Sequence, residues 1–203
     1  MGTQRLIVRG LRCDDRSSYL EVFGDPAIAS FDDYELVEEA DVDEVVRAAI
    51  ARNALGGDEC ELAVVLATDP DDAIGFMTLR PAGTSPDEES VSVGYHFSRR
   101  VHGRGLATEA LAGLLTWWRS VSSARVYAYI DPENLPSRRV LERLAFIAEG
   151  ERVLHGKREL VFAAPDRNSV SEAALARDQS VTVAEANSKR ARAKPRRGSS
   201  QAP

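Results

Sequence analysis

Apolar positions recur along the chain with two different spacings. Over residues 91–97, apolar side chains occupy every second position, which indicates a strand with one buried face. Over residues 106–118, they recur three or four positions apart, which indicates a helix that packs through one face. The chain therefore combines both kinds of regular structure.

The same spacings and their end signals predict the order of the elements. We expect strands over residues 3–9, 60–66, 74–80, 91–97, 124–130, 146–149 and 160–163. We expect helices to begin at Asp14-Asp15, Asp41, Leu106 and Asn134. A turn is expected at residues 68–72, and loops at 24–40, 81–90 and 150–158. This order predicts an α/β or α+β layer fold with a mixed sheet.

Charge divides the chain into two parts. Residues 165–203 carry eight Lys/Arg and four Asp/Glu, so 18 basic and 28 acidic residues remain in residues 1–164. We predict one globular domain over residues 1–164 and a mostly disordered basic tail over residues 165–203, which has too few apolar residues to offset the entropy of ordering. The acidic domain suits a cationic substrate, although acidity serves solubility equally well.

Several classes of protein are not expected from the composition. No apolar run reaches the length that spans a bilayer, and the first residues do not resemble a secretory signal, so we expect a cytoplasmic protein. The two cysteines lack a CxxC spacing and the three histidines lack a ligand spacing, so no metal is expected. Nucleic-acid binding is expected at most weakly, through the basic segment 189–197.

A glycine-rich junction carries the strongest chemical signal. Gly103 and Gly105 flank Arg104 directly before the helix expected at Leu106. The first amides of a helix have no intrahelical partner, and glycine lets a ligand approach them closely, so this junction predicts a phosphate-bearing cofactor. The GxxxxGK[ST] motif of nucleoside-triphosphate sites is absent, and Thr108 replaces the third small residue of a dinucleotide fingerprint, although Asp131 keeps a dinucleotide open as an alternative.

Two segments resemble one known family. Residues 94–110 (GYHFSRRVHGRGLATEA) and 131–144 (DPENLPSRRVLERL) are similar to signatures of the Gcn5-related N-acetyltransferases (GNAT), in particular the RimJ/RimL-type branch. The resemblance implies a mostly antiparallel sheet of about seven strands flanked by about four helices. It also implies a bulge in the strand over residues 91–97, splayed central strands, and acetyl-CoA as the co-substrate.

The resemblance also implies which residues hold acetyl-CoA. The loop that would bind the pyrophosphate comprises His102, Gly103, Arg104, Gly105, Leu106 and Ala107. The pantetheine arm would pair with the backbone of Phe97, Ser98 and Arg99, and Asn134 would contact the co-substrate from the other side.

The residues that transfer protons depart from the family pattern. Ser92 stands where many members have a glutamate, and Leu141 stands where many have a tyrosine. Ser137 matches a serine of the RimJ/RimL branch and is our candidate hydroxyl near the sulfur, although a first-turn serine also satisfies backbone groups. Glu159 and His96 are candidate bases, with a chain of waters as the alternative.

These observations predict an acetyl-CoA-dependent N-acetyltransferase. The expected acceptor is a primary amine, either a protein N-terminus or a small molecule, and the acids at residues 32–39 would suit a cationic amine. A non-catalytic acyl-CoA-binding module, a dinucleotide-binding protein and a nucleic-acid binder acting through the tail are the alternatives. A homodimer is left open.

Overall fold

The computed structural model describes residues 1–32, 34–55, 59–82 and 90–166. All helices and strands named below lie in the unit Met1–Ala164. The predicted basic tail, apart from its first two residues, lies outside the described residues, so its disorder stays a prediction.

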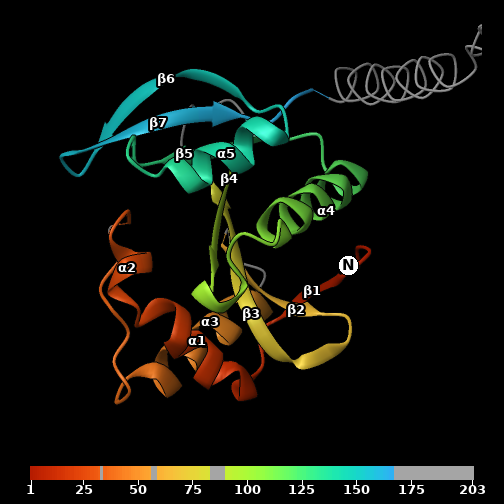
Figure 1. Cartoon of the computed structure of the whole chain (residues 1–203), viewed down its shortest axis with the longest axis vertical. Coiled ribbons are helices and arrows are strands. Elements are labelled where there is room, and N and C mark those ends of the chain that lie inside the picture. Colours follow the sequence, from red (N-terminus) through yellow and green to blue (C-terminus); the bar gives the residue numbers. More distant parts are fainter. Residues whose placement is uncertain (33, 56–58, 83–89, 167–203) are drawn as a thin grey trace, which may run out of the picture. The chain divides into compact units, whose positions relative to one another are not determined.

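A seven-stranded sheet forms the centre of the fold (Figure 1). Its strands are β1 (Leu6–Gly10), β2 (Cys60–Leu66), β3 (Asp69–Pro81), β4 (Ser90–Phe97), β5 (Arg125–Ile130), β6 (Ile147–Leu154) and β7 (Lys157–Ala163). They lie in the order β1-β2-β3-β4-β5-β7-β6. Only the β4–β5 pair is parallel, so the sheet is mixed and mostly antiparallel, as predicted.

Helices cover both faces of this sheet. They are α1 (Arg16–Phe23), α2 (Pro26–Ala29), α3 (Val42–Ala54), α4 (Leu106–Val121) and α5 (Leu135–Arg143), with short 3₁₀ turns η1 (Cys13–Asp15) and η2 (Arg99–Val101). The helices α4 and α5 bury Leu111 and Leu141 against Val93 and Ala128 of the sheet. On the opposite face, α1 and α3 form a second apolar core around Phe76 of β3. The sheet therefore separates two cores that lie back to back.

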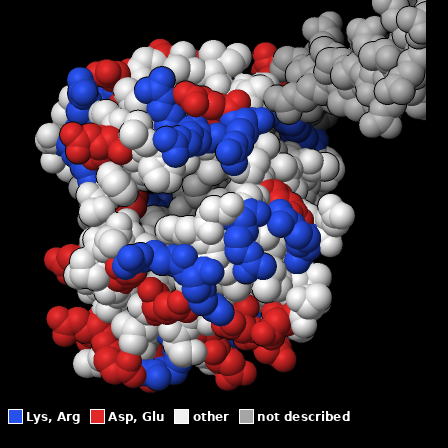
Figure 2. All heavy atoms as spheres, in the orientation of Figure 1, with Lys and Arg blue, Asp and Glu red and all other residues white. Residues whose placement is uncertain are grey.

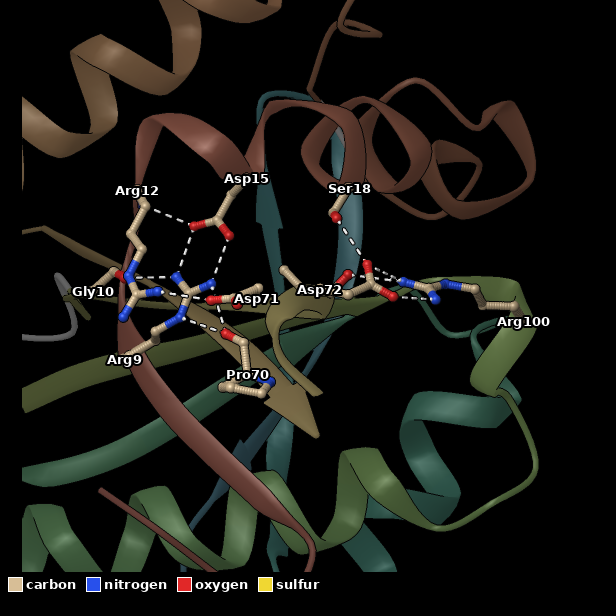
Figure 3. Close-up of polar contacts among 10 residues, drawn as sticks. Arg9, Gly10, Arg12, Asp15, Ser18, Pro70, Asp71, Asp72 and Arg100 are labelled. Atoms are coloured by element: carbon tan, nitrogen blue, oxygen red, sulfur yellow. Dashed lines mark hydrogen bonds and ion pairs between the residues drawn. The ribbon is translucent and has the colours of Figure 1, made fainter. Parts of the chain in front are cut away.

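A buried ion pair fastens the start of the helical layer to the sheet (Figure 3). The Arg9 guanidinium of β1 donates to both carboxylate oxygens of Asp15, at 2.8 and 2.7 Å. Asp15 also accepts the backbone N–H of Arg12 at 2.7 Å, and its residue surface is only 1 % exposed. The pair thus fixes η1, which leads directly into α1, against the edge of the sheet.

The two central strands separate after a short stretch of pairing. β4 pairs with β5 only from Ser90↔Arg125 to Ser92↔Tyr127. This short ladder confirms the predicted splay of the central strands. The prediction of a bulge is wrong where β4 pairs with β3. The register of these two strands runs without a shift from Pro81↔Val91 to Gly75↔Phe97. The gap therefore comes from divergence of β4 and β5, not from a slip in the β3–β4 ladder.

Three local expectations differ from the structure. Asp25 accepts the backbone N–H of Ala27 at 2.8 Å and so starts α2, where we expected only a loop. The turn expected at residues 68–72 is shorter, since β3 already begins at Asp69. Residues 150–158, expected to be a loop, instead form most of the β6–β7 hairpin. The sequence did not predict this hairpin because β6 is almost wholly exposed and shows no apolar alternation.

Candidate active site

A cleft of about 620 Å³ occupies the gap between β4 and β5. Its lining comes from α2, β4, the junction before α4, β5, α5 and β7. The space-filling view shows the hollow between two lobes, with basic side chains on both of its rims (Figure 2). Arg99 lies on one side of the lining, and Arg139 and Arg143 of α5 lie on the other. Charge at the mouth therefore favours an anionic ligand.

The glycine junction forms one end of the cleft. Gly103 and Gly105 have φ angles of +74° and +73°, a left-handed conformation that glycine adopts without strain. A Cβ at Gly103 would meet no atom within 4 Å, and one at Gly105 only the Arg5 guanidinium at 3.9 Å. The chain thus leaves open space in front of the first turn of α4, whose amides are free to bind phosphate oxygens.

An ion pair holds this junction in place from behind. Glu109 of α4 accepts from the Arg5 guanidinium at 2.6 Å, from the Arg5 backbone N–H at 2.8 Å and from the Thr3 hydroxyl at 2.6 Å. Partial burial raises the pKa of Glu109, but these hydrogen bonds outweigh it and leave that pKa below its usual value. Arg5 also donates to the backbone carbonyl of Arg104, so the loop and the helix share one anchor.

The segment between β4 and the glycine junction is clamped to the rest of the domain (Figure 3). Arg100 of η2 donates to both carboxylate oxygens of Asp72 at 2.6 and 2.8 Å, and pairs with Glu21 of α1 at 3.3 Å. The Arg100 hydrogen bond lowers the pKa of Asp72. The Ser98 hydroxyl donates to Glu21 as well. Charged groups of β3 and α1 therefore set the position of the junction.

The edge of β4 that faces the gap presents unpaired backbone groups. The Ser98 N–H donates to the Ile74 carbonyl of β3. Because backbone groups alternate in direction along an antiparallel strand, those of Tyr95 and Phe97 point away from β3, towards β5. The Phe97 carbonyl accepts from Nε2 of His102 at 2.9 Å, which ties the loop to the strand. An extended arm of a ligand has backbone partners here.

Most of the residues expected to hold the co-substrate line this one cleft. They are Phe97, Arg99, His102, Gly103, Gly105, Leu106, Ala107, Asn134 and Ser137. Two others do not. Ser98 is fully buried and bonded to Glu21, and Arg104 is exposed outside the lining.

The first turn of α5 presents a hydroxyl to the cleft. Asn134 caps the helix, because its side-chain oxygen accepts the Ser137 N–H at 3.1 Å. The Ser137 side chain is therefore not needed to cap the helix, and it lines the cleft beside the Tyr95 phenol. The Tyr95 phenol donates to the Ser137 carbonyl at 3.3 Å, and burial raises the pKa of Tyr95 to about 12. Strand β4 and helix α5 thus meet across the gap at two hydroxyl groups.

His96 lies at the other end of the cleft, on the face of the sheet that α1 covers. Its ring packs against those of Phe23 and Tyr34, with centroids 5.2 and 5.5 Å away. Its Nε2 lies 3.1 Å from a carboxylate oxygen of Asp32, while Nδ1 has no partner among the described residues. Because a carboxylate only accepts, this contact places a proton on Nε2 and leaves the lone pair of a neutral ring on Nδ1.

Glu159 of β7 lines the cleft opposite His96. Its carboxylate pairs with Arg152 at 2.7 Å, and the Arg152 guanidinium lies 3.2 Å from the centre of the Tyr129 ring. The Tyr129 phenol donates to the Ala82 carbonyl at 3.1 Å, and burial raises its pKa. The Glu159 carboxylate is thus engaged by a cation, whereas His96 is engaged only by an anion.

Some residues of the site were not singled out from the sequence. Tyr95 and Thr108 belong to the motif 94–110, but nothing in the spacing separates their side chains from packing residues. The Thr108 hydroxyl is buried without a partner among the described residues, at the first turn of α4. Of the acids expected to border the substrate, Asp32 lines the cleft, Glu39 pairs with Arg16, and residue 33 lies outside the described residues.

Two further findings concern the described residues as a whole. Within residues 1–32, 34–55, 59–82 and 90–166, no three His, Cys, Asp or Glu side chains gather as metal ligands would. Over the same residues, no helix is long and apolar enough to span a membrane.

A mixed sheet whose central strands part over a glycine loop at a helix N-terminus defines an α/β protein with a cleft suited to a phosphate-bearing ligand. Comparison with known proteins names the class. The model of the acetyltransferase (GNAT) domain family matches residues 5–147. The chain therefore belongs to the GNAT family, and it is an N-acetyltransferase.

Named relatives agree with this assignment. The uncharacterized N-acetyltransferase YnaD of Bacillus subtilis (strain 168) is 26 % identical over 149 residues, covering 73 % of this chain and 82 % of the relative. Mycobacterium smegmatis RimJ, solved in complex with CoA-disulfide, superimposes with a TM-score of 0.64 at 22 % identity, over 78 % of this chain and 80 % of that one. RimL, a ribosomal L7/L12 α-N-protein acetyltransferase solved with coenzyme A, gives 0.66 at 16 % identity, over 81 % and 96 %.

Proposed function

We propose that the enzyme transfers the acetyl group of acetyl-CoA to a primary amine, either a protein N-terminus or a small amine, by direct attack on the thioester. One observation carries the proposal. A single cleft joins the open glycine junction on one face of the sheet to His96, Asp32 and Glu159 on the other. An anionic co-substrate and an amine would therefore meet in the gap between β4 and β5.

The described residues fit acetyl-CoA. The left-handed glycines leave room for a pyrophosphate before the α4 amides, and the partnerless Thr108 hydroxyl adds a donor there. Arg139 and Arg143 supply charge for further phosphate groups. The unpaired edge of β4 offers hydrogen bonds to an amide-containing arm. Acetyl-CoA supplies the activated acetyl group; every other contribution comes from the chain.

The protein then has three tasks in the reaction. It must hold a neutral amine within attack distance of the thioester carbonyl, which is the largest part of the rate gain. The backbone N–H of Phe97, at the free edge of β4, would stabilise charge that develops on the carbonyl oxygen. His96, oriented by Asp32, would take the proton from the amine, and the Ser137 hydroxyl would donate one to the departing sulfur and recover it through solvent from the His96 imidazolium.

Isothermal titration of acetyl-CoA tests the co-substrate site. Gly105→Glu puts a carboxylate and a side chain into the open space before α4, so we expect micromolar binding to the natural chain and no measurable binding to the variant. Gly156→Glu is the matched control. Gly156 has a φ of +82° and open space too, but it does not line the cleft. Equal affinity in both variants would exclude the glycine junction as the binding site.

A further inference from the structure

The part of the cleft that faces the α1 side of the sheet has a chemistry of its own. We call it the acceptor chamber; it is lined by Ala27, Ile28, Phe31, Asp32, His96, Tyr129 and Glu159. Because side chains alternate between the two faces of a sheet, the strand residues His96, Tyr129 and Glu159 lie together on the face that α1 covers. Ala128 and Ile130 of β5 pack into the core under α4 and α5, so Tyr129, between them, faces the opposite way.

Apolar side chains form one wall of this chamber. Ala27 and Ile28 belong to α2, and Phe31 follows that helix directly. Because α2 is only four residues long and starts at the Asp25 cap, this cap determines where the wall stands. The wall accommodates the carbon body of an acceptor and offers it no charge.

The charges around the chamber do not cancel. Arg99 lies 3.6 Å from Asp25, and Arg152 lies 2.7 Å from Glu159, so each of these cations already faces a carboxylate. Among the described residues, Asp32 faces the His96 ring and no cation. The three described carboxylates Asp25, Asp32 and Glu159 thus stand against the two guanidinium groups of Arg99 and Arg152, and the carboxylate without a cation is Asp32, on the lining itself.

Resting on the proposed function, we propose that Asp32 selects acceptors by charge: the enzyme acetylates primary amines whose neighbouring groups are neutral or cationic and rejects amines with a carboxylate close by. A negative group beside the reacting amine would approach Asp32, which no cation of the described residues offsets, because Arg139 and Arg143 stand on α5, where they are assigned to the phosphate groups. The shared chemistry is an amine on a neutral carbon body, present both in a peptide N-terminus and in a small alkyl amine.

Three peptides that differ at one position test the proposal. They are Ala-Asp-Ala amide, Ala-Asn-Ala amide and Ala-Lys-Ala amide, which share the same reacting α-amine, and their rates are compared per neutral amine because a neighbouring charge shifts the pKa of that amine. We expect kcat/KM from CoA release to rise from the Asp to the Asn to the Lys peptide, with about five- to tenfold between Asp and Asn. In Asp32→Asn, this ratio is expected to fall to about two, whatever the variant does to the overall rate.

Glu35→Gln is the matched control for the net charge of the protein. Glu35 is exposed, lies three residues beyond Asp32 and does not line the cleft, so this variant should keep the full ratio between peptides. Equal rates for the Asp and Asn peptides in the natural chain overturn the proposal. An unchanged ratio in Asp32→Asn, or a reduced one in Glu35→Gln, overturns the assignment to Asp32.

A fourth acceptor, 2-phenylethylamine, distinguishes the two sources of the amine. If 2-phenylethylamine is acetylated and none of the peptides is, small alkyl amines are the acceptors, and selection among peptides is overturned. Turnover of the peptides without discrimination leaves the acetyltransferase proposal standing and removes only the charge selection. Absence of CoA release with all four acceptors contradicts the proposed function itself.

Discussion

At the scale of single residues, Ser137 shows how a neighbour frees a side chain for chemistry. A serine in the first turn of a helix commonly bonds to backbone. Here the Asn134 side chain takes the capping hydrogen bond, so the Ser137 hydroxyl is not needed to cap the helix, and Ser137 lines the cleft. The hydroxyl is therefore available to a ligand in the cleft.

We expect Ser137→Ala to lower kcat by tenfold or more while the affinity for acetyl-CoA stays within twofold, because the lost group donates a proton only as the sulfur departs. Stopped-flow measurement of CoA release together with titration calorimetry separates the two effects. Ser137→Thr retains a hydroxyl at this position and should recover part of the rate. An unchanged kcat in the alanine variant would contradict the role.

The sequence predicted these residues unevenly. His96, Ser137 and Glu159 were named as candidates, and the structure brings all three to one cleft. Their partners were out of reach, because Asp32 meets His96 across 64 residues of sequence, and Arg152 meets Glu159 only through the β6–β7 hairpin, which the sequence did not predict. Ala145 illustrates a different difficulty. It follows the last turn of α5 and adopts a φ of +58°, a left-handed conformation that an alanine in the sequence does not predict.

At the scale of elements, the short turn η2 determines where the glycine junction lies. Arg100 is the centre of its clamp, with Asp72 on the β2–β3 hairpin side and Glu21 on α1. None of these three residues lines the cleft. The clamp thus acts on ligand binding only through position.

Arg100→Ala removes the clamp and leaves Asp72 and Glu21 without their cation. We expect the dissociation constant for acetyl-CoA to rise about fivefold and the melting temperature to fall by about 2–4 °C, the effect of roughly 1 kcal/mol in a domain of this size. Calorimetry and thermal unfolding provide the two readouts. Arg12→Ala, which breaks the exposed Arg12–Asp71 pair, should change neither. An affinity that stays constant in Arg100→Ala would show that the junction needs no clamp.

Elements with an apolar period were the ones predicted correctly. The strand of residues 91–97 and the helix that begins at Leu106 follow the expected positions because burial imposes the period on their sequences. Helix α2 and strand β6 were not predicted at their full extent. The first rests on one cap at Asp25, and the second is exposed over nearly its whole length, so neither leaves a periodic pattern.

At the scale of the whole domain, the buried Arg9–Asp15 pair links stability to a single pair of charges. Asp15→Ala leaves the Arg9 guanidinium almost buried and without its anion. We expect the free energy of unfolding to fall by about 3–5 kcal/mol, because an uncompensated buried charge costs far more than the net gain of the pair. Denaturation with guanidinium chloride measures this change.

A double variant checks the reason for that loss. Arg9→Met together with Asp15→Leu removes both charges and fills the space with apolar side chains, so most of the stability should return. A double variant as unstable as Asp15→Ala would assign the loss to the Asp15 hydrogen bond with the Arg12 backbone instead.

The parting of β4 and β5 also bears on how the protein avoids unwanted association. A strand edge with unpaired amide and carbonyl groups attracts any extended polypeptide, and open sheets usually protect such edges by charge or shortness. Here the Tyr95–Phe97 edge lies inside the sheet, between α5 and α2, and not at its outer border. Strands β1 and β6 form the outer edges of the sheet, so the backbone groups that would pair with an amide-bearing arm are kept away from the positions where a folded neighbour could add a strand.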